Sequence, residues 1–297
     1  MNLENTMSKY LVKNKYLIPF ENKFSINNAP TSPSDFDLSK KEYNKELDGL
    51  KDELRDLQDI LYAHNKYAVL CLFQALDAAG KDSTIRAVTT GINPAGFQVF
   101  SFKAPSKEEL EHDFLWRTAK RLPERGRIGI FNRSYYEEVL VVKVHPQYLG
   151  GQNLPNFTDS DDFWEERYQS IRDHELHLSK SGIIILKFWL NISKEEQKNR
   201  FIRRIDRPDK NWKFSAGDLE ERKYWDDYQK AFKDALNATS RPWAPWYSIP
   251  ADNKLYMRLT VAKIIAKQLR KLDMNYPELS EVEKSELANY KTDLENE

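Results

Sequence analysis

The chain has 297 residues, with 46 Lys and Arg against 46 Asp and Glu, so its formal net charge is zero. This balance excludes a globally basic nucleic-acid coat and a globally acidic, solvating chain, although it leaves room for a local basic groove. Hydrophobic residues make up 40% of the chain, enough for a sizeable core. The single cysteine, Cys71, excludes an internal disulfide framework and a cysteine-based zinc cluster.

Neither a membrane span nor a secretory signal is expected. The longest unbroken apolar run, residues 67–73, is far shorter than a bilayer requires. The first residues lack the apolar centre and small-residue cleavage site of a signal peptide. We therefore expect a cytoplasmic protein that does not associate with membranes.

The composition along the chain predicts three parts. Residues 1–38 contain Pro30 and Pro33 among Asn and Ser, which favours an irregular N-terminal arm. Residues 39–272 alternate between strand-like and helical segments and are expected to form a single domain. Residues 273–297 hold eight acids and two lysines, which favours a solvated acidic tail or helix.

Helices are expected after three capping boxes, in which Ser39, Ser106 and Ser193 are each followed three residues later by Glu. The first of these helices is expected to end near Asn65. Further helices are expected over 162–180, 218–238 and 254–272.

Short apolar runs are expected to form strands, and their lack of alternation suits strands buried on both faces of a parallel sheet. The runs are residues 67–73, 97–102, 128–131, 183–190 and 246–249. Strands that alternate with helices predict an α/β layer fold with right-handed crossovers.

The string LCLFQALDAAGKDSTIRAV, residues 70–88, places a loop of small residues between a buried strand and a helix. A P-loop has this context, because backbone N–H groups at a helix N-terminus bind phosphate. Gly80 lets the backbone approach a phosphate, and Lys81 adds a mobile positive charge. The match to GxxxxGK[ST] is incomplete, since Ala75 replaces the first glycine and Asp82 replaces the Ser or Thr. An ordinary strand–turn–helix is the alternative.

Two carboxylates, Asp77 and Asp82, lie in or beside this loop. They would repel a bound phosphate unless a cation lay between them. Mg²⁺ binds one or two carboxylates together with phosphate oxygens. The loop therefore predicts a magnesium–phosphate site, although Asp82 alone could simply be an acid at a helix start.

A second string, RIGIFNRSYYEEVL, spans residues 127–140. Asn132, Arg133 and Ser134 follow its apolar strand, at the end where open α/β sheets bind ligands. Walker-B strands present an Asp to magnesium at such a position, whereas Asn132 is neutral. Arg133 is suited to stabilise charge on a transferring phosphoryl group. Alternatively, Asn132 and Ser134 merely cap the next helix.

Residues 198–213 form a basic stretch with seven Lys or Arg and two Asp. Its arginines at 200, 203, 204 and 207 are three or four residues apart and so share a helical face. Beside a P-loop, this stretch favours a lid over residues 198–218 that closes on a polyanion. A solvated face or a nucleic-acid patch is the alternative.

Other basic residues could extend this surface, namely Lys103, Arg117, Arg121 and Lys187. Lys187 interrupts an apolar strand, so it needs a buried partner. A substrate phosphate and a nearby carboxylate are both open as that partner.

Five separated strings resemble the polyphosphate kinase 2 family: FQALDAAGKDSTIRAV, SFKAPSKEEL, HDFLWR, GIFNRSYYEEVLV and NWKFSAGDLEER. They cover roughly residues 40–272. The resemblance implies a P-loop kinase-like fold, in which a parallel sheet is flanked by helices and covered by a helical lid. It also implies Mg²⁺-dependent, reversible transfer of the terminal phosphoryl group of inorganic polyphosphate to AMP or ADP. GMP and GDP are left open as further acceptors.

The resemblance also assigns roles to individual positions. Catalysis falls on Asp77, Lys81 and Arg133, and metal binding falls on Asp77 and Asp82. Acceptor-nucleotide contacts fall on Asp77, Lys103, Arg117, Asn132 and Arg133. Phosphate and polyphosphate binding falls on the loop residues Ala78, Ala79, Gly80, Lys81, Asp82 and Ser83 and on the lid residues Arg203, Arg204 and Arg207.

Asn132 also bears on the acceptor. Family members that phosphorylate only diphosphates commonly carry Asp there, so the resemblance indicates the subclass that accepts both AMP and ADP. A homo-oligomer is expected by resemblance, and no nucleic-acid partner is expected. Two other functions stay open: an ATP-dependent nucleoside monophosphate kinase on the same fold, and a non-catalytic polyanion- or RNA-binding module that uses the basic stretch.

Overall fold

A computed structural model describes residues 10–34, 38–155 and 158–297. In this part of the chain, five parallel strands form one sheet in the order β2–β3–β1–β4–β5. The strands are β1 (Ala68–Gln74), β2 (Phe97–Ser101), β3 (Ile128–Asn132), β4 (Ile183–Asn191) and β5 (Trp246–Pro250). Each predicted strand is present within one or two residues of its expected bounds, and the predicted α/β fold with a parallel sheet is confirmed.

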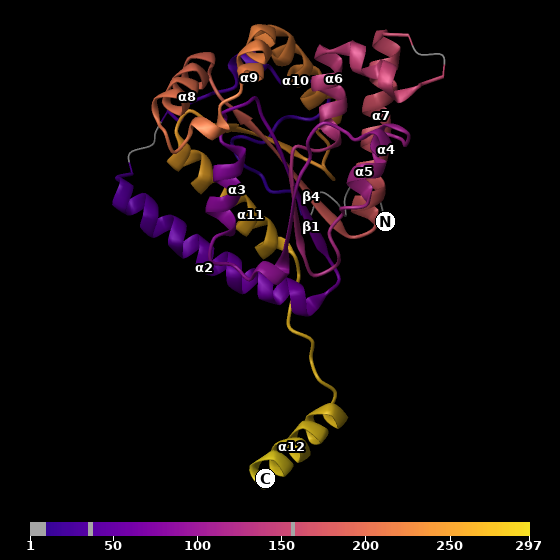
Figure 1. Cartoon of the computed structure of the whole chain (residues 1–297). Coiled ribbons are helices and arrows are strands. Elements are labelled where there is room, and N and C mark those ends of the chain that lie inside the picture. Colours follow the sequence, from indigo (N-terminus) through magenta and orange to yellow (C-terminus); the bar gives the residue numbers. More distant parts are fainter. Residues whose placement is uncertain (1–9, 35–37, 156–157) are drawn as a thin grey trace.

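Helices cover both faces of the sheet and give three layers (Figure 1). One face packs against α2 (Lys40–His64), α3 (Lys81–Thr89) and α11 (Lys254–Lys271). The other face packs against α7 (Asp161–Lys180) and α10 (Trp225–Thr239). Because both faces are covered, strands β1 and β4 are buried along almost their whole length.

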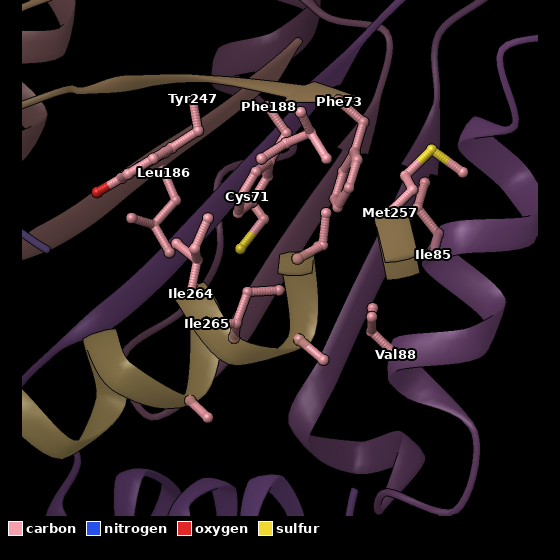
Figure 2. Close-up of a cluster of buried hydrophobic side chains, with 14 of the residues drawn as sticks. Cys71, Phe73, Ile85, Val88, Leu186, Phe188, Tyr247, Met257, Ile264 and Ile265 are labelled. Carbon is pink, nitrogen blue, oxygen red and sulfur yellow. The ribbon is translucent and has the colours of Figure 1, made fainter. Parts of the chain in front are cut away.

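Figure 2 shows how the first of these layers is packed. Side chains of β1, β4 and β5 meet α11 and α3, and the labelled ones are Cys71, Phe73, Leu186, Phe188, Tyr247, Met257, Ile264, Ile265, Ile85 and Val88. Cys71 is fully buried, and burial raises the pKa of its thiol to about 12. This thiol therefore acts as a small apolar core residue.

Shorter elements connect the layers. They are η1 (Ile26–Asn28), η2 (Pro94–Gly96), α4 (Lys107–Leu110), α5 (Trp116–Ala119), η3 (Tyr135–Val139), α6 (Val141–Val144), η4 (Pro146–Gln152), α8 (Lys194–Asp206), η5 (Asn211–Lys213), α9 (Ala216–Glu221) and η6 (Arg222–Tyr224). The prediction of one continuous helix over 218–238 is therefore wrong, because α9, η6 and α10 share this range.

Capping follows the sequence at two of the three predicted boxes. Ser39 and Ser106 each form the full reciprocal box with the Glu three residues later. Ser193 accepts from the Glu196 backbone N–H, but the Glu196 carboxylate binds Arg200 and Arg203. The third box is thus replaced by ion pairs that run along α8.

The two ends of the described chain differ in how they attach. Val12 and Ile18 of the N-terminal arm are buried, and the arm is joined to β5 by the Leu17–Tyr247 bridge. At the other end, residues 273–280 lead to α12 (Glu281–Glu295), which projects away from the layers (Figure 1). Every residue of α12 is exposed. No helix in the described ranges is long and apolar enough to span a membrane.

Lys187 of β4 lies in the core and does not extend the basic surface, so that part of the prediction is wrong. Its Nζ lies 2.7 Å from Glu175 Oε2 and also donates to Tyr136 Oη at 2.8 Å and to the Thr239 carbonyl at 2.9 Å. Lys187 and Glu175 are both 0% exposed. The partner that the sequence left open is therefore a carboxylate.

Candidate active site

The predicted phosphate loop follows the carboxyl end of β1 and ends where α3 begins. Gly80 is the residue before α3 and has a φ of 109°, which favours glycine. A Cβ there would lie 3.1 Å from Met257 Cε of α11, so the packing of the loop on α11 also favours glycine. The loop thus places the N-terminus of α3 at the end of the sheet, in a P-loop-like arrangement.

Lys81 is the first residue of α3 and folds back over the loop. Its Nζ donates to the Ala75 carbonyl at 2.7 Å and to the Leu76 carbonyl at 3.4 Å, and the residue is only 9% exposed. Burial, together with the nearby Arg133 guanidinium, lowers the pKa of Lys81. An anion bound here would favour its charged form.

Two side-chain pairs connect the loop to the end of β3. Arg133 Nη2 donates to Asp77 Oδ1 at 2.9 Å, and Asn132 Nδ2 donates to Asp82 Oδ1 at 2.7 Å. Arg133 has a φ of 64°, and its backbone N–H donates to the Phe73 carbonyl of β1. The phosphate loop and the Asn132–Arg133 segment therefore meet side by side, as neighbouring parallel strands require.

Arg200 was grouped with the lid arginines by sequence, but it lies beneath the loop. It is 4% exposed, and its guanidinium donates to the carbonyls of Ala78 at 3.1 Å and Ala79 at 2.6 Å. It also donates to the Asp252 carbonyl at 3.1 Å. Arg200 thus joins the phosphate loop to the segment after β5. Its neighbours Gln197 and Phe201 on the buried face of α8 are the sequence signal that distinguishes it.

A cleft of about 690 Å³ opens over the loop. Two Asp and twelve Lys or Arg line it, so its charge is strongly positive although the chain is neutral. The basic lining residues are Lys81, Arg86, Lys103, Arg133, Arg200, Arg203, Arg204, Arg207, Lys210, Lys213, Lys254 and Arg258.

Several lining residues were missed as site candidates. Lys210 and Lys213 belong to the predicted basic stretch, whereas Arg86 comes from α3 and Lys254 and Arg258 come from the first turns of α11. The signal for the last two is their i,i+4 spacing directly after a strand. Partial burial beside Arg200 and Arg203 lowers the pKa of Lys254 to about 8.

The three predicted lid arginines all line the cleft, and each forms an ion pair with a carboxylate nearby in the sequence. Arg203 pairs with Glu196 at 2.6 Å, Arg204 with Asp218 at 3.1 Å and Arg207 with Asp209 at 2.9 Å. The Arg203 and Arg207 side chains are 54% and 60% exposed, so solvent weakens these pairs. A polyanion could compete for both guanidinium groups.

The structure gathers most of the predicted site residues but not all. Asp77, Ala78, Gly80, Lys81, Asp82, Ser83, Lys103, Asn132 and Arg133 line the cleft. Ala79 is fully buried, and its carbonyl accepts from Arg200. Arg117 is not among the lining residues, because its guanidinium lies against the Phe102 ring and pairs with Glu109 at 3.2 Å. Arg121 likewise lies over the Phe100 ring.

A smaller cavity of about 190 Å³ adjoins the cleft, and Asp77 and Arg133 line both. Its other charged lining residues are Glu137, Asp218, Glu221 and Arg222, so acids outnumber bases here. Burial raises the pKa of Glu137. Sequence reasoning did not select Glu137, although it lies four residues after Arg133.

The acidic residues permit a magnesium ion but do not enclose one. In the described ranges, no three His, Cys, Asp or Glu side chains converge as a complete metal cage. Asp77 and Asp82 both line the cleft, and the Asp77 side chain is 29% exposed. Since Mg²⁺ keeps several waters and takes phosphate oxygens as ligands, this donor set fits the predicted metal.

Comparison with known families shows to which family the chain belongs. The family model described as Polyphosphate kinase 2 matches residues 37–277. The chain belongs to the polyphosphate kinase 2 family. The matched segment contains the phosphate loop, the end of β3, the lid arginines and α11, so the family prediction made from five short strings is confirmed.

Individual relatives agree with this placement. An ADP-polyphosphate phosphotransferase of Rhodopseudomonas palustris is 53% identical over 92% of this chain and 94% of its own. An AMP/ADP-polyphosphate phosphotransferase of Meiothermus ruber is 42% identical over 89% of this chain and 95% of its own. The crystal structure of Polyphosphate Kinase 2 from Arthrobacter aurescens TC1 aligns with a TM-score of 0.81 at 36% identity, covering 90% of this chain and 93% of that one.

Proposed function

We propose that this enzyme transfers the terminal phosphoryl group of inorganic polyphosphate to AMP and to ADP. The cleft carries the proposal, because twelve basic side chains around one phosphate loop suit a long polyanion better than a single nucleotide. The family and the names of the relatives support the same reaction.

The proposed transfer is a direct in-line displacement. An oxygen of the acceptor's terminal phosphate attacks the last phosphorus of polyphosphate, the bond to the bridging oxygen breaks, and the shortened chain leaves with that electron pair. Since the transition state needs little covalent assistance, catalysis is mainly positioning and charge stabilisation. One phosphoanhydride replaces another, so we expect the reaction to be reversible.

The chain's own residues divide this work between them. Lys81 and Arg133 bind and stabilise the transferring group, and Asn132 contacts the acceptor phosphate without adding negative charge. Ala78, Gly80 and Ser83 present the loop backbone to phosphate, and Arg203, Arg204 and Arg207 close over the polyphosphate and exclude water. Mg²⁺, held by Asp77 and Asp82 together with phosphate oxygens, would neutralise charge on the reacting phosphates.

The first experiment mixes the protein with Mg²⁺, long-chain polyphosphate and AMP, without ATP, and follows nucleotides by chromatography. ADP followed by ATP is the expected result. Formation of ATP only when ADP is supplied would remove AMP from the proposal. No product from either acceptor, with folded protein, would overturn it. Chelation of Mg²⁺ by EDTA should stop the reaction. Unchanged turnover in EDTA would contradict the proposed requirement for Mg²⁺.

Asn132 offers a test of acceptor choice. In Asn132→Asp a second carboxylate would face Asp82, whose Oδ1 now accepts from Asn132 Nδ2. We expect turnover with AMP to fall about tenfold more than turnover with ADP, because added charge near the acceptor phosphate is repulsive. Asn132→Ser is the matched neutral control. An unchanged AMP-to-ADP ratio in Asn132→Asp would contradict the role.

Two other functions make different predictions. An ATP-dependent nucleotide kinase would consume ATP and AMP without polyphosphate. A non-catalytic polyanion- or RNA-binding module would show salt-sensitive binding that survives Lys81→Ala. Cytoplasmic location, homo-oligomeric assembly and the use of GMP or GDP stay predictions.

A further inference from the structure

The basic cleft is lined by segments that follow all five strands, so its residues lie in the order of the strands in the sheet. Arg133 follows β3 and Lys81 follows β1, and both belong to the proposed reaction centre. Lys254 and Arg258 follow β5, at the opposite edge of the sheet from β2. Since neighbouring strands are about 4.8 Å apart, the ends of β1 and β5 are roughly 10 Å apart. The cleft therefore extends past the reaction centre towards α11.

Lys254 and Arg258 are held beside the phosphate loop by the residue between them. They are four residues apart on α11 and so share a face, and the intervening Met257 packs against the loop, since a Cβ at Gly80 would lie 3.1 Å from Met257 Cε. Arg86 lines the same cleft from α3, which packs beside α11 (Figure 2). We refer to Arg86, Lys254 and Arg258 as the distal wall.

The distal wall differs from the lid in how its charges are balanced. Each of the three lid arginines is paired with a carboxylate. Within the described ranges, Arg86, Lys254 and Arg258 form no ion pair with Asp or Glu. Burial and the neighbouring arginines, first Arg200 and then Arg203, lower the pKa of Lys254 to about 8. Positive charge that the protein gathers and does not balance favours an anion as the missing partner.

The position of Lys254 in its helix points the same way. It is the first residue of α11, where the helix dipole disfavours a cation. A residue that breaks a local rule without a compensating contact in the protein is typical of a binding site. A bound phosphate would interact favourably with both the ammonium group and the helix N-terminus.

We propose that the distal wall binds phosphate units of polyphosphate remote from the transferring group and makes the enzyme bind long chains more tightly than short ones. This rests on the proposed function, in which the acceptor contacts Asn132 and Arg133 on the β3 side of the loop. The donor chain then leaves Lys81 on the other side and runs towards Arg258. Because all its units belong to one molecule, each further contact adds affinity at little extra cost in ordering. A chain too short to reach the wall lacks these contacts.

The test compares long-chain polyphosphate with tripolyphosphate in the variants Arg86→Gln and Arg258→Gln. Binding of end-labelled long-chain polyphosphate is followed by fluorescence anisotropy with Mg²⁺ and without nucleotide, and tripolyphosphate is the competitor. Each variant should bind the long chain about three- to tenfold more weakly, since it loses one charge-assisted contact, and tripolyphosphate less than about twofold more weakly. The plot of log Kd against log salt for the long chain should become less steep by roughly one unit, which a merely structural role would not cause.

Three further variants serve as controls. Lys263→Gln removes a cation from the same helix outside the cleft and should leave both affinities unchanged. Arg258→Lys keeps the charge and should retain most of the affinity for the long chain. Arg204→Gln should weaken both ligands, because its partner Asp218 lines the smaller cavity together with Asp77, close to the reaction centre. The proposal is overturned if the Arg86→Gln and Arg258→Gln variants bind the long chain normally, or if they lose both ligands equally.

Steady-state rates with AMP and ADP separate this proposal from the proposed function. If the natural protein forms no nucleotide product but the distal-wall variants lose long-chain binding, the proposed function fails and the distal wall is supported. If the protein is active, the variants should raise the KM for long-chain polyphosphate more than they lower kcat. A higher KM for AMP or ADP alone would place the acceptor at the distal wall and overturn the proposal.

Discussion

The phosphate loop and the core beside β4 each bury a lysine, and they neutralise it in different ways. Lys187 meets a carboxylate, a hydroxyl and a carbonyl, so all three of its N–H groups have acceptors. Lys81 donates only to loop carbonyls among the described contacts and has Arg133 nearby. The Lys187 ammonium has a carboxylate in direct contact, whereas the Lys81 ammonium has Asp77, Asp82 and Glu137 nearby but forms no direct ion pair with them among the described residues.

This contrast shows that burial alone does not identify a functional lysine. Burial lowers the pKa of both groups, that of Lys187 to about 8. The two lysines differ in their partners, because Lys187 contacts the Glu175 carboxylate within the core. The loop instead leaves Lys81 beside a cleft that supplies further positive charge. The two lysines should therefore respond in opposite ways to the same substitution.

Lys81→Met should give the largest effect on activity. We expect turnover with ADP and polyphosphate to fall by about three orders of magnitude or more, since charge on the transferring group loses its main lysine partner. The free energy of unfolding should change by only about 1 kcal/mol, because only bonds to carbonyls are lost. Steady-state rates and urea unfolding check both values. Normal turnover in a folded variant would contradict the assignment.

Lys187→Met should give the reverse pattern. Removal of the ammonium leaves the Glu175 carboxylate buried without its charge partner, which costs about 3–5 kcal/mol of stability. The double change Lys187→Met with Glu175→Leu is the matched control and should recover most of that loss. Urea unfolding of both variants measures this. A single variant as stable as the natural protein would mean that the pair is not an ion pair.

Arg200→Lys tests how the loop is held in place. Lysine keeps the charge but cannot bridge the carbonyls of Ala79 and Asp252 as the guanidinium does. We expect turnover to fall about 10- to 100-fold, while affinity for polyphosphate changes only about threefold. Arg203→Lys, at a lid residue proposed to contact polyphosphate, is the comparison and should lower affinity more than turnover. Equal loss of affinity and turnover would indicate a direct phosphate contact.

Lys254 gives the smallest effect, which is a change with pH. Its pKa is lowered to about 8 in the ligand-free protein, so it loses its charge as the pH rises above 8. Above this pH, Lys254 must take up a proton when polyphosphate binds. This uptake should weaken the affinity for polyphosphate about tenfold between pH 7 and pH 9, in addition to any loss caused by other groups. Lys254→Arg should remove this component. Identical pH profiles of both proteins would contradict the shift.

The fold was predictable because its signals are local. Apolar runs such as residues 67–73 and 128–131 form strands wherever both faces are covered, and Ser39 and Ser106 cap their helices as expected. The break at residues 222–224 was not predictable from periodicity. There Arg222 turns inward to donate to Gln197 Oε1 at 2.7 Å, a contact between α8 and η6 that no local pattern contains.

The site was predictable only in part, for a similar reason. The loop and the end of β3 carry recognisable strings, and adjacent parallel strands must bring them together. The partner of Lys187 and the positions of Arg117 and Arg200 depend on side chains distant in sequence, so spacing could not decide them. Lys254 and Arg258 join the cleft because α11 begins where β5 ends.

The central position of β1 also affects how the chain folds as it is synthesised. Ala68 pairs with Ile183 of β4, about 115 residues later, so β1 lacks one neighbour until much of the chain exists. At about 5–20 residues per second, a ribosome needs roughly 6–23 s to make that interval. During this time the edge of β1 that pairs with β4 remains open. Yield of soluble protein should therefore depend on translation rate and on chaperones.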